Sequence, residues 1–130
     1  MAVLVDTDLL VEQERGADVL NRLAPGEDRY ISVITMSELL HGVHRAVGAR
    51  RVQRQAFVES VLQAVEPVPI TPPIARIDAE IWAGLSRSGS RIGDHDLWIA
   101  ATAIAHGFGV ATLNAVEFRR VPGLRVLGAS

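Results

Sequence analysis

Acidic side chains recur in this sequence at the ends of apolar stretches. Each has a local explanation, because a carboxylate in the first turn of a helix is stabilised by the helix dipole by about 0.3–1 kcal/mol. Several carboxylates brought within a few ångströms instead repel one another, and they stay ionised only with a cation between them. Oxygen ligands suit Mg²⁺ or Mn²⁺, which activate water and neutralise charge in phosphodiester cleavage. The acids concerned are Asp6, Asp8, Glu38, Asp94, Asp96 and Glu117.

The stretch Ile92–Gly107 predicts the helix around which the other elements are arranged. It is apolar almost without interruption from residue 97 to residue 105, and a helix that is apolar nearly all round lies inside a protein. Asp94 is a good N-cap after Gly93, and Gly107 is a typical C-terminal stop. A buried helix of this kind directs its acidic start at a shared site, because carboxylates there must meet water, a cation or a partner.

Strands and helices are expected to alternate along the whole chain. That pattern predicts an α/β fold, an open, mostly parallel five-stranded sheet with helices on both faces, in a single domain over residues 1–130. Sites in such sheets lie outside the carboxyl ends of the strands. Thr35 and Glu38 also match a capping box, which is an alternative role for that acid. We expect strands at 2–5, 30–34, 67–70, 110–113 and 124–127, helices at 9–14, 17–24, from 35, at 49–65 and from 72, and a loop at 86–93.

Composition excludes several kinds of chemistry. The chain has 130 residues, 48% of them hydrophobic, and a formal net charge of −2. It contains no cysteine, which excludes disulfides and thiolate sites, and all 13 of its lysine and arginine positions are arginine. No apolar run is long enough to span a membrane and no signal peptide is visible, so we expect a cytoplasmic protein. An acidic chain would hold RNA through a metal and local arginines.

Four segments of the chain resemble the PIN domains of VapC-type toxins from bacterial toxin–antitoxin modules. They are VLVDTDLL, ITMSELLHGV, IGDHDLWIAATAIAHG and VATLNAVEFRRVPGLRV, and together they cover nearly the whole chain in order and spacing. The resemblance implies the toxin of a type II system, a Mg²⁺- or Mn²⁺-dependent endoribonuclease that cleaves structured RNA such as tRNA or rRNA. It also implies a homodimer and a cognate VapB-type antitoxin.

The resemblance also assigns site residues. The family's first three acids fall on Asp6, Glu38 and Asp96. Its fourth position varies, and here either Asn114, which cannot carry charge, or Glu117 fills it. The remaining candidates are Asp94 and Asp8 as additional ligands, and Thr7 and Thr112 as hydroxyls that orient ligands.

Other classes of protein share parts of this pattern. The sequence Asp6-Thr7-Asp8 after a strand is the nucleophile motif of haloacid dehalogenase-type phosphatases, and response-regulator receivers also place an acid at a strand end. Both families use a lysine to hold the phosphoryl group, and this chain has none. A non-catalytic protein-interaction module is a third alternative.

The histidines suggest a further kind of metal site. Glu38 and His41 match a di-iron ligand pattern, but the second copy that this pattern needs is missing. We therefore expect His41 and His44 at the surface or facing a partner. His95 lies between two site acids, where it is either simply exposed or binds a substrate phosphate when protonated.

Overall fold

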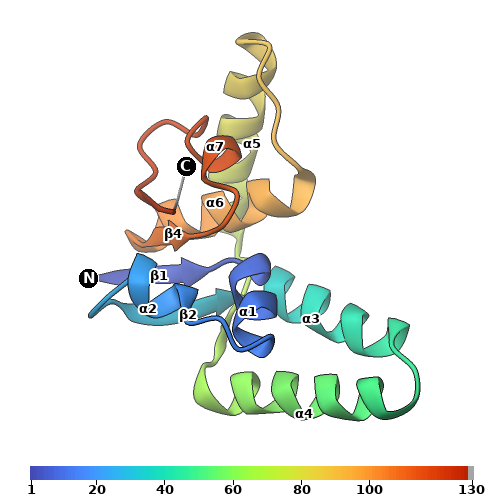
Figure 1. Ribbon diagram of the computed structural model, residues 1–130. Helices are drawn as coiled ribbons and strands as arrows, with labels where there is room; N and C mark the ends of the chain where they lie inside the picture. The colour runs from blue at the N-terminus through green and yellow to red at the C-terminus, as the bar shows by residue number, and fades with distance from the viewer. Residues whose placement is uncertain (129–130) are drawn as a thin grey trace.

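A sheet of five parallel strands lies at the centre of the computed structural model, which describes residues 1–128 (Figure 1). The strand order β3-β2-β1-β4-β5 puts β1 in the middle, and the expected parallel sheet is confirmed. Both edge strands are only two residues long, which leaves little free edge for pairing with other chains. The strands are β1 (Ala2–Val5), β2 (Asp28–Ser32), β3 (Pro67–Val68), β4 (Gly109–Ala111) and β5 (Val126–Leu127).

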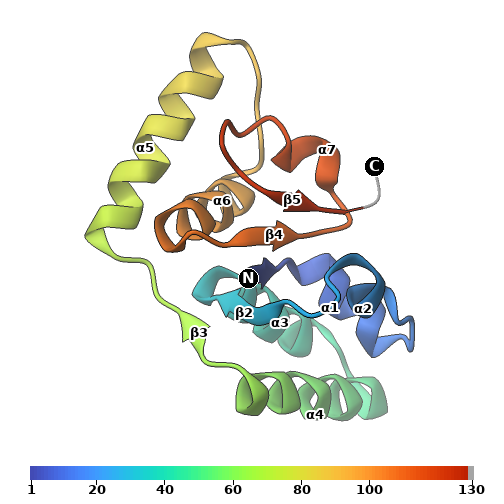
Figure 2. The ribbon, with the colours of Figure 1, turned by 90° about the vertical axis from the view of Figure 1, so that its left-hand side faces the viewer.

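Side chains of the central strand alternate between two apolar cores, one on each face of the sheet. Val3 and Val5 pack with residues of the first four helices, whereas Leu4 packs with residues of the last three. Helices therefore cover both faces, as expected. In Figures 1 and 2, α3 and α4 run together at the bottom, and α5 rises beside α6 toward the top. The helices are α1 (Thr7–Glu14), α2 (Val19–Leu23), α3 (Val33–Arg45), α4 (Gly48–Ala64), α5 (Pro72–Arg87), α6 (Asp94–His106) and α7 (Ala115–Phe118).

Helix α6 contains more buried residues than any other described helix, as its composition predicted. Six of its thirteen residues, from Leu97 to Ala103, are buried. Gly107 ends it in a left-handed conformation with φ of 71°, where a side chain would be strained. The expected N-cap is wrong by one residue, because Gly93 is the cap and its carbonyl accepts a hydrogen bond from the Leu97 amide at 2.9 Å. Asp94 is thus the first helical residue.

The start of α3 differs from the expectation. Strand β2 ends at Ser32 rather than at residue 34, and the Ser32 hydroxyl caps α3 by accepting a hydrogen bond from the Ile34 amide at 3.0 Å. Thr35 is therefore a fully buried residue inside the helix, and the predicted capping box with Glu38 is wrong. The physical reason is that an apolar run as short as residues 30–34 fits a strand or the first turn of a buried helix equally well.

The boundaries of the other helices and strands differ from the expected ones by a few residues. The loop expected at residues 86–93 begins later, because α5 continues to Arg87. Strands β3, β4 and β5 are shorter than expected, since only the residues listed above form ladder pairs. None of the helices described within residues 1–128 has the length and apolar character that crossing a membrane requires.

Candidate active site

Asp6 occupies the end of the central strand and is held from two sides. It is buried, with 4% of its surface exposed. The Thr7 amide donates to Asp6 Oδ1 at 2.8 Å, and the Thr112 hydroxyl donates to Asp6 Oδ2 at 2.7 Å. The Thr112 hydroxyl in turn accepts from the Asn114 amide at 2.8 Å. The first residue of α1 and the residue after β4 therefore hold this carboxylate between them.

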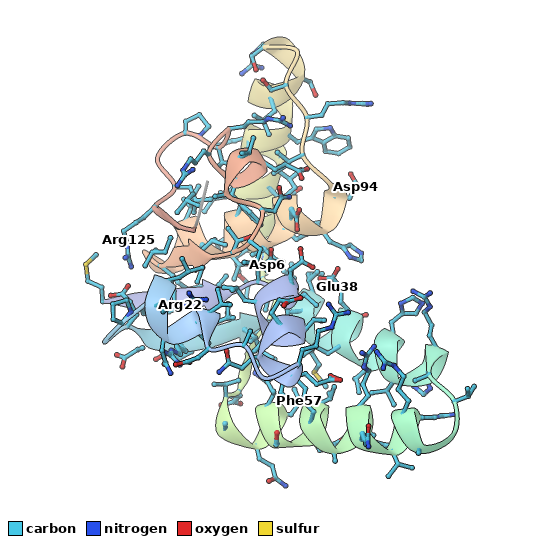
Figure 3. All side chains as sticks on the ribbon, viewed as in Figure 1. Asp6, Arg22, Glu38, Phe57, Asp94 and Arg125 are labelled. Carbon is cyan, nitrogen blue, oxygen red and sulfur yellow. The ribbon has the colours of Figure 1, made fainter. Side chains whose placement is uncertain are left out.

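Glu38 on α3 reaches the same edge of the sheet. The Thr7 hydroxyl donates to Glu38 Oε1 at 2.8 Å, and it lies 3.3 Å from the Thr35 hydroxyl. Figure 3 shows Asp6, Glu38 and Asp94 on one side of the molecule, coming from β1, α3 and the start of α6. His95, whose role the sequence left open, also lies at this edge: its Nδ1 is 3.5 Å from Glu38 Oε2.

Asp96, in the first turn of α6, is the carboxylate with the most perturbed titration. Burial, together with the negative charges of Asp6, Glu117 and Glu38, raises its pKa to about 7. Its side chain forms no hydrogen bond or ion pair with any other residue in the described part of the chain. Asp96 is thus a half-buried carboxylate that other carboxylates face and that no cation balances.

Glu117 is held firmly on α7. Its Oε1 accepts from the Gly93 amide at 2.6 Å, and its Oε2 accepts from the Asn114 side-chain amide at 2.5 Å. Asn114 and Glu117 were alternatives for one position, but the structure brings both to the site and makes Asn114 a donor to Glu117. Sequence reasoning missed the Gly93 amide, because its role depends on where the loop before α6 lies.

The cluster has an excess of negative charge. The pKa of Asp6 is raised to about 6: burial raises it most, hydrogen bonds from Thr112 and Thr7 lower it, and the charges of Asp8 and Glu38 raise it. No arginine within residues 1–128 forms an ion pair with any of the site carboxylates, and His95 beside Glu38 is their one potential cationic partner there.

The donor set suits a hard divalent cation, but the side chains are not yet arranged around one point. Within residues 1–128, no three histidine, aspartate or glutamate side chains are close enough to ligate one ion as they stand. All the available donors are carboxylate oxygens apart from one imidazole, as Mg²⁺ and Mn²⁺ prefer. Asp96 is the acid best able to adjust, since its rotation breaks none of the described hydrogen bonds.

The other candidates lie at the margin of this cluster or away from it. Asp8 is exposed on α1 and forms none of the described hydrogen bonds, although its charge acts on Asp6. Asp94 is exposed and lines a neighbouring pocket with Trp82. His41 and His44 are exposed on α3, as expected.

Comparison with known proteins identifies the family. A model of the PIN domain matches residues 3–124. Ribonuclease VapC1 of Rickettsia felis is 36% identical over 131 residues, which cover 100% of this chain and 98% of that protein. The tRNA(fMet)-specific endonuclease VapC of Salmonella typhimurium is 34% identical over 96 residues, covering 74% of this chain and 71% of that protein.

Solved structures agree with this result. VapBC2 of Rickettsia felis, bound to a DNA fragment from its promoter, contains a chain that superposes with a TM-score of 0.87 at 27% identity and full coverage of both chains. VapBC-5 of Mycobacterium tuberculosis gives a TM-score of 0.83 at 30% identity and 98% coverage of both chains. The chain therefore belongs to the PIN-domain family and, within it, to the VapC ribonucleases.

This membership confirms the family that the sequence motifs indicated and decides against the phosphatase and receiver alternatives. It makes the chain a nuclease, a hydrolase of phosphodiester bonds.

Proposed function

We propose that this chain is the toxin of a type II toxin–antitoxin module and cleaves structured RNA with the help of Mg²⁺ or Mn²⁺. The observation that carries the proposal is the unbalanced charge at one sheet edge, where Asp6 and Asp96 both have raised pKa values and no arginine partner. Such a cluster is stable in its ionised form only with a cation. A divalent ion supplies activation of water and neutralisation of phosphate charge.

In this proposal Asp6, Glu38 and Asp96 are the catalytic metal ligands, with Glu117 and Asp94 as secondary candidates. Asp6 provides the fixed ligand, because its two oxygens are already oriented by hydrogen bonds. Thr7, Thr112 and Asn114 act as positioning residues. Each of them bonds a carboxylate and leaves other lone pairs of that carboxylate free: Thr7 bonds Asp6 and Glu38, Thr112 bonds Asp6, and Asn114 bonds Glu117.

Arginines near this edge provide contacts for the RNA backbone. The Arg120 guanidinium donates to the Arg91 carbonyl at 2.5 Å, which places both residues beside the loop that leads into α6. Arginine binds phosphate in a bidentate manner. An acidic protein therefore has a local basic rim next to its carboxylates, consistent with RNA as the substrate. The related tRNA(fMet)-specific endonuclease makes tRNA a reasonable first substrate to test.

The partner proposed for this toxin is a VapB-type antitoxin, because the structural neighbours are VapBC complexes. Apolar side chains at positions 39, 40 and 43 of α3 offer such a partner little surface, because Leu39 and Val43 are buried in the core and only Leu40 of the three remains partly accessible. The pocket beside α4 contains Arg45, Arg50 and Arg54 instead, which favours an acidic antitoxin segment there. A homodimer and a cytoplasmic location remain predictions.

The decisive experiment is cleavage of defined RNAs by purified protein with Mn²⁺ or Mg²⁺, and with EDTA in its place. Asp6→Asn and Asp96→Asn should each abolish cleavage, because each removes a charged ligand. The matched control is Asp28→Asn, an exposed acid at the opposite end of β2, which should retain full activity. Retained cleavage by Asp96→Asn would contradict the assignment, and absence of metal-dependent cleavage in the unaltered protein would favour the non-catalytic interaction module.

A further inference from the structure

Two adjoining pockets open beside the first turn of α6, next to the carboxylate cluster. Their volumes are about 410 Å³ and about 280 Å³, and both are lined by Trp82, Asp94 and Leu97. The larger pocket also includes Gly93, whose amide donates to Glu117 at the candidate active site. A group bound in these pockets would therefore lie beside an RNA chain that crosses the carboxylates.

The smaller pocket contains a buried acid without a partner. Asp78 on α5 is 7% exposed, and its Oδ1 is fully buried with no hydrogen-bond partner within residues 1–128. It lies on the apolar face of α5, between the buried residues Ile74 and Leu85. A buried carboxylate oxygen that accepts no bond is unfavourable. Because Asp78 lines the pocket, a rotation of its side chain toward the pocket would let a ligand donate hydrogen bonds to the carboxylate. The sequence carried a signal for this residue, because an acid interrupts the apolar spacing of α5.

The wall and rim of these pockets carry the other groups that a nucleotide needs. Trp82 is 63% exposed, so that its indole presents a flat apolar surface to solvent. Bases of unpaired RNA stack on such surfaces whatever their identity. Trp98 lines the smaller pocket, and Arg91 lines the larger one, where its guanidinium can reach a phosphate.

We propose that these pockets bind one unpaired nucleotide of the RNA substrate beside the cleaved bond, with its base against Trp82, Asp78 as hydrogen-bond acceptor and Arg91 at its phosphate. The proposal rests on the ribonuclease function proposed above and names a determinant of its specificity. A carboxylate matches guanine best, because the N1–H and N2–H donors of guanine lie side by side. Uracil is disfavoured, because its single N3–H donor lies between two carbonyl acceptors.

Nucleotide binding can be measured without RNA cleavage. The chain has two tryptophans, so Trp98→Phe leaves Trp82 as the single indole reporter while keeping an aromatic wall. Titration of this variant with guanosine 5′-monophosphate should quench the fluorescence at concentrations about tenfold lower than titration with uridine 5′-monophosphate. Adding Asp78→Asn should remove most of that difference. Adding Glu80→Gln, which neutralises an exposed acid on the same helix, should preserve it.

Specificity in cleavage provides the second measurement. The unaltered protein, Asp78→Asn, Trp82→Ala and Trp82→Phe are each incubated with an RNA pool of randomised sequence, and the new ends are sequenced. One position next to the cut should be rich in guanine and poor in uracil. Asp78→Asn and Trp82→Ala should flatten the profile at that position alone, whereas Trp82→Phe should retain it.

The outcomes separate this proposal from the one on which it rests. Selective nucleotide binding without any RNA cleavage would support the pocket and contradict the ribonuclease. Cleavage with an unchanged base profile in Asp78→Asn, together with equal quenching by both nucleotides, would overturn the pocket. The pockets could also be covered by a second copy of the chain, and sedimentation of Trp82→Ala tests this. If Trp82→Ala dissociates an oligomer and leaves the base profile unchanged, this face is a contact between copies of the chain and the proposal is overturned.

Discussion

Asp96 illustrates how a single residue can oppose stability while it supplies a carboxylate to the proposed metal site. The pKa of Asp96 is about 7 and that of Asp6 about 6 in the folded protein, both above the ordinary value of 3.8. At pH values between the ordinary pKa and these raised pKa values, the folded state therefore binds more protons than the unfolded state. The resulting stabilisation is complete below the ordinary value and is lost as the pH rises through 6 to 7.

We therefore expect Asp96→Asn to stabilise the metal-free protein at neutral pH. After allowance for solvent screening at this half-buried position, the gain in unfolding free energy should be about 1–2 kcal/mol near pH 7.5. It should vanish near pH 4, where the original side chain is already protonated. Urea unfolding with EDTA at both pH values measures the difference, and Asp28→Asn serves as the exposed control. A gain of equal size at both pH values would show that charge repulsion is not its cause.

Thr112 permits a separate test, because its hydroxyl both donates to Asp6 Oδ2 and accepts from the Asn114 amide. Thr112→Val keeps the shape and removes both bonds. We expect kcat for RNA cleavage to fall about 10- to 100-fold, as is typical when a group that orients a metal ligand is lost. The unfolding free energy should fall by about 1–3 kcal/mol. Thr112→Ser should restore most of the activity, and normal kcat in the valine variant would contradict a positioning role.

At the scale of elements, two glycines separate the effect of backbone conformation at a helix end from the effect of helix propensity inside a helix. Gly107 ends α6 with φ of 71° and has open space around it, so a methyl group there meets only backbone strain. Gly84 lies inside α5, where the nearest atom to an added Cβ is Arg87 Nη2 at 4.0 Å. Gly107→Ala should lower the unfolding free energy by about 1 kcal/mol. Gly84→Ala should raise it by about 0.5–1 kcal/mol.

The comparison between these two variants is informative because both make the same chemical change. Urea unfolding at one pH measures both. If Gly84→Ala also destabilised the protein, packing between α5 and α6 rather than helix propensity would control the result. If Gly107→Ala were neutral, the end of α6 would have to rearrange without cost.

Helix α6 could be predicted from sequence because its burial and its ends are encoded locally. Leu97–Ala103 is apolar on every side, and Gly107 is a local stop signal. The start of α3 could not be predicted in the same way. Ser32 and Thr35 are both good caps, and the choice depends on pairing of Ser32 with Val68 in β3, which is a long-range contact.

The candidate site likewise contains residues whose position could be predicted from sequence and residues whose contacts could not. Asp6 follows a recognisable strand, so its place at the sheet edge was predictable from residue order. The bonds of Glu117 were not, because its partners Gly93 and Asn114 come from two loops whose approach depends on tertiary packing. The unpartnered state of Asp78 likewise required the structure, although its position within an apolar helix face was visible in the sequence.

At the scale of the whole molecule, a cation should stabilise the fold. Binding to the folded state alone raises the unfolding free energy by about 2.7 kcal/mol at a hundredfold excess over Kd. We therefore expect millimolar Mn²⁺ to raise Tm. The shift should be largely lost in Asp6→Asn and reduced less in Glu117→Gln, because both Glu117 oxygens already accept hydrogen bonds from the protein. Thermal melts with Mn²⁺ and with EDTA measure it, and an unmoved Tm in the unaltered protein would count against a metal site.

The hydroxyl of Thr112 has a consequence for a chain that is still being synthesised. Asp6 and Glu38 leave the ribosome early, but the group that orients Asp6 Oδ2 follows β4, and Glu117 comes later still. The pairing of the central strand β1 with β4 also has to wait for residues 109–111. A nascent polypeptide would therefore carry the first acids before the residues that complete the proposed site. Nuclease activity would begin only after nearly the whole sequence has been translated, which protects the translating ribosome and the tRNAs around it from the enzyme being made.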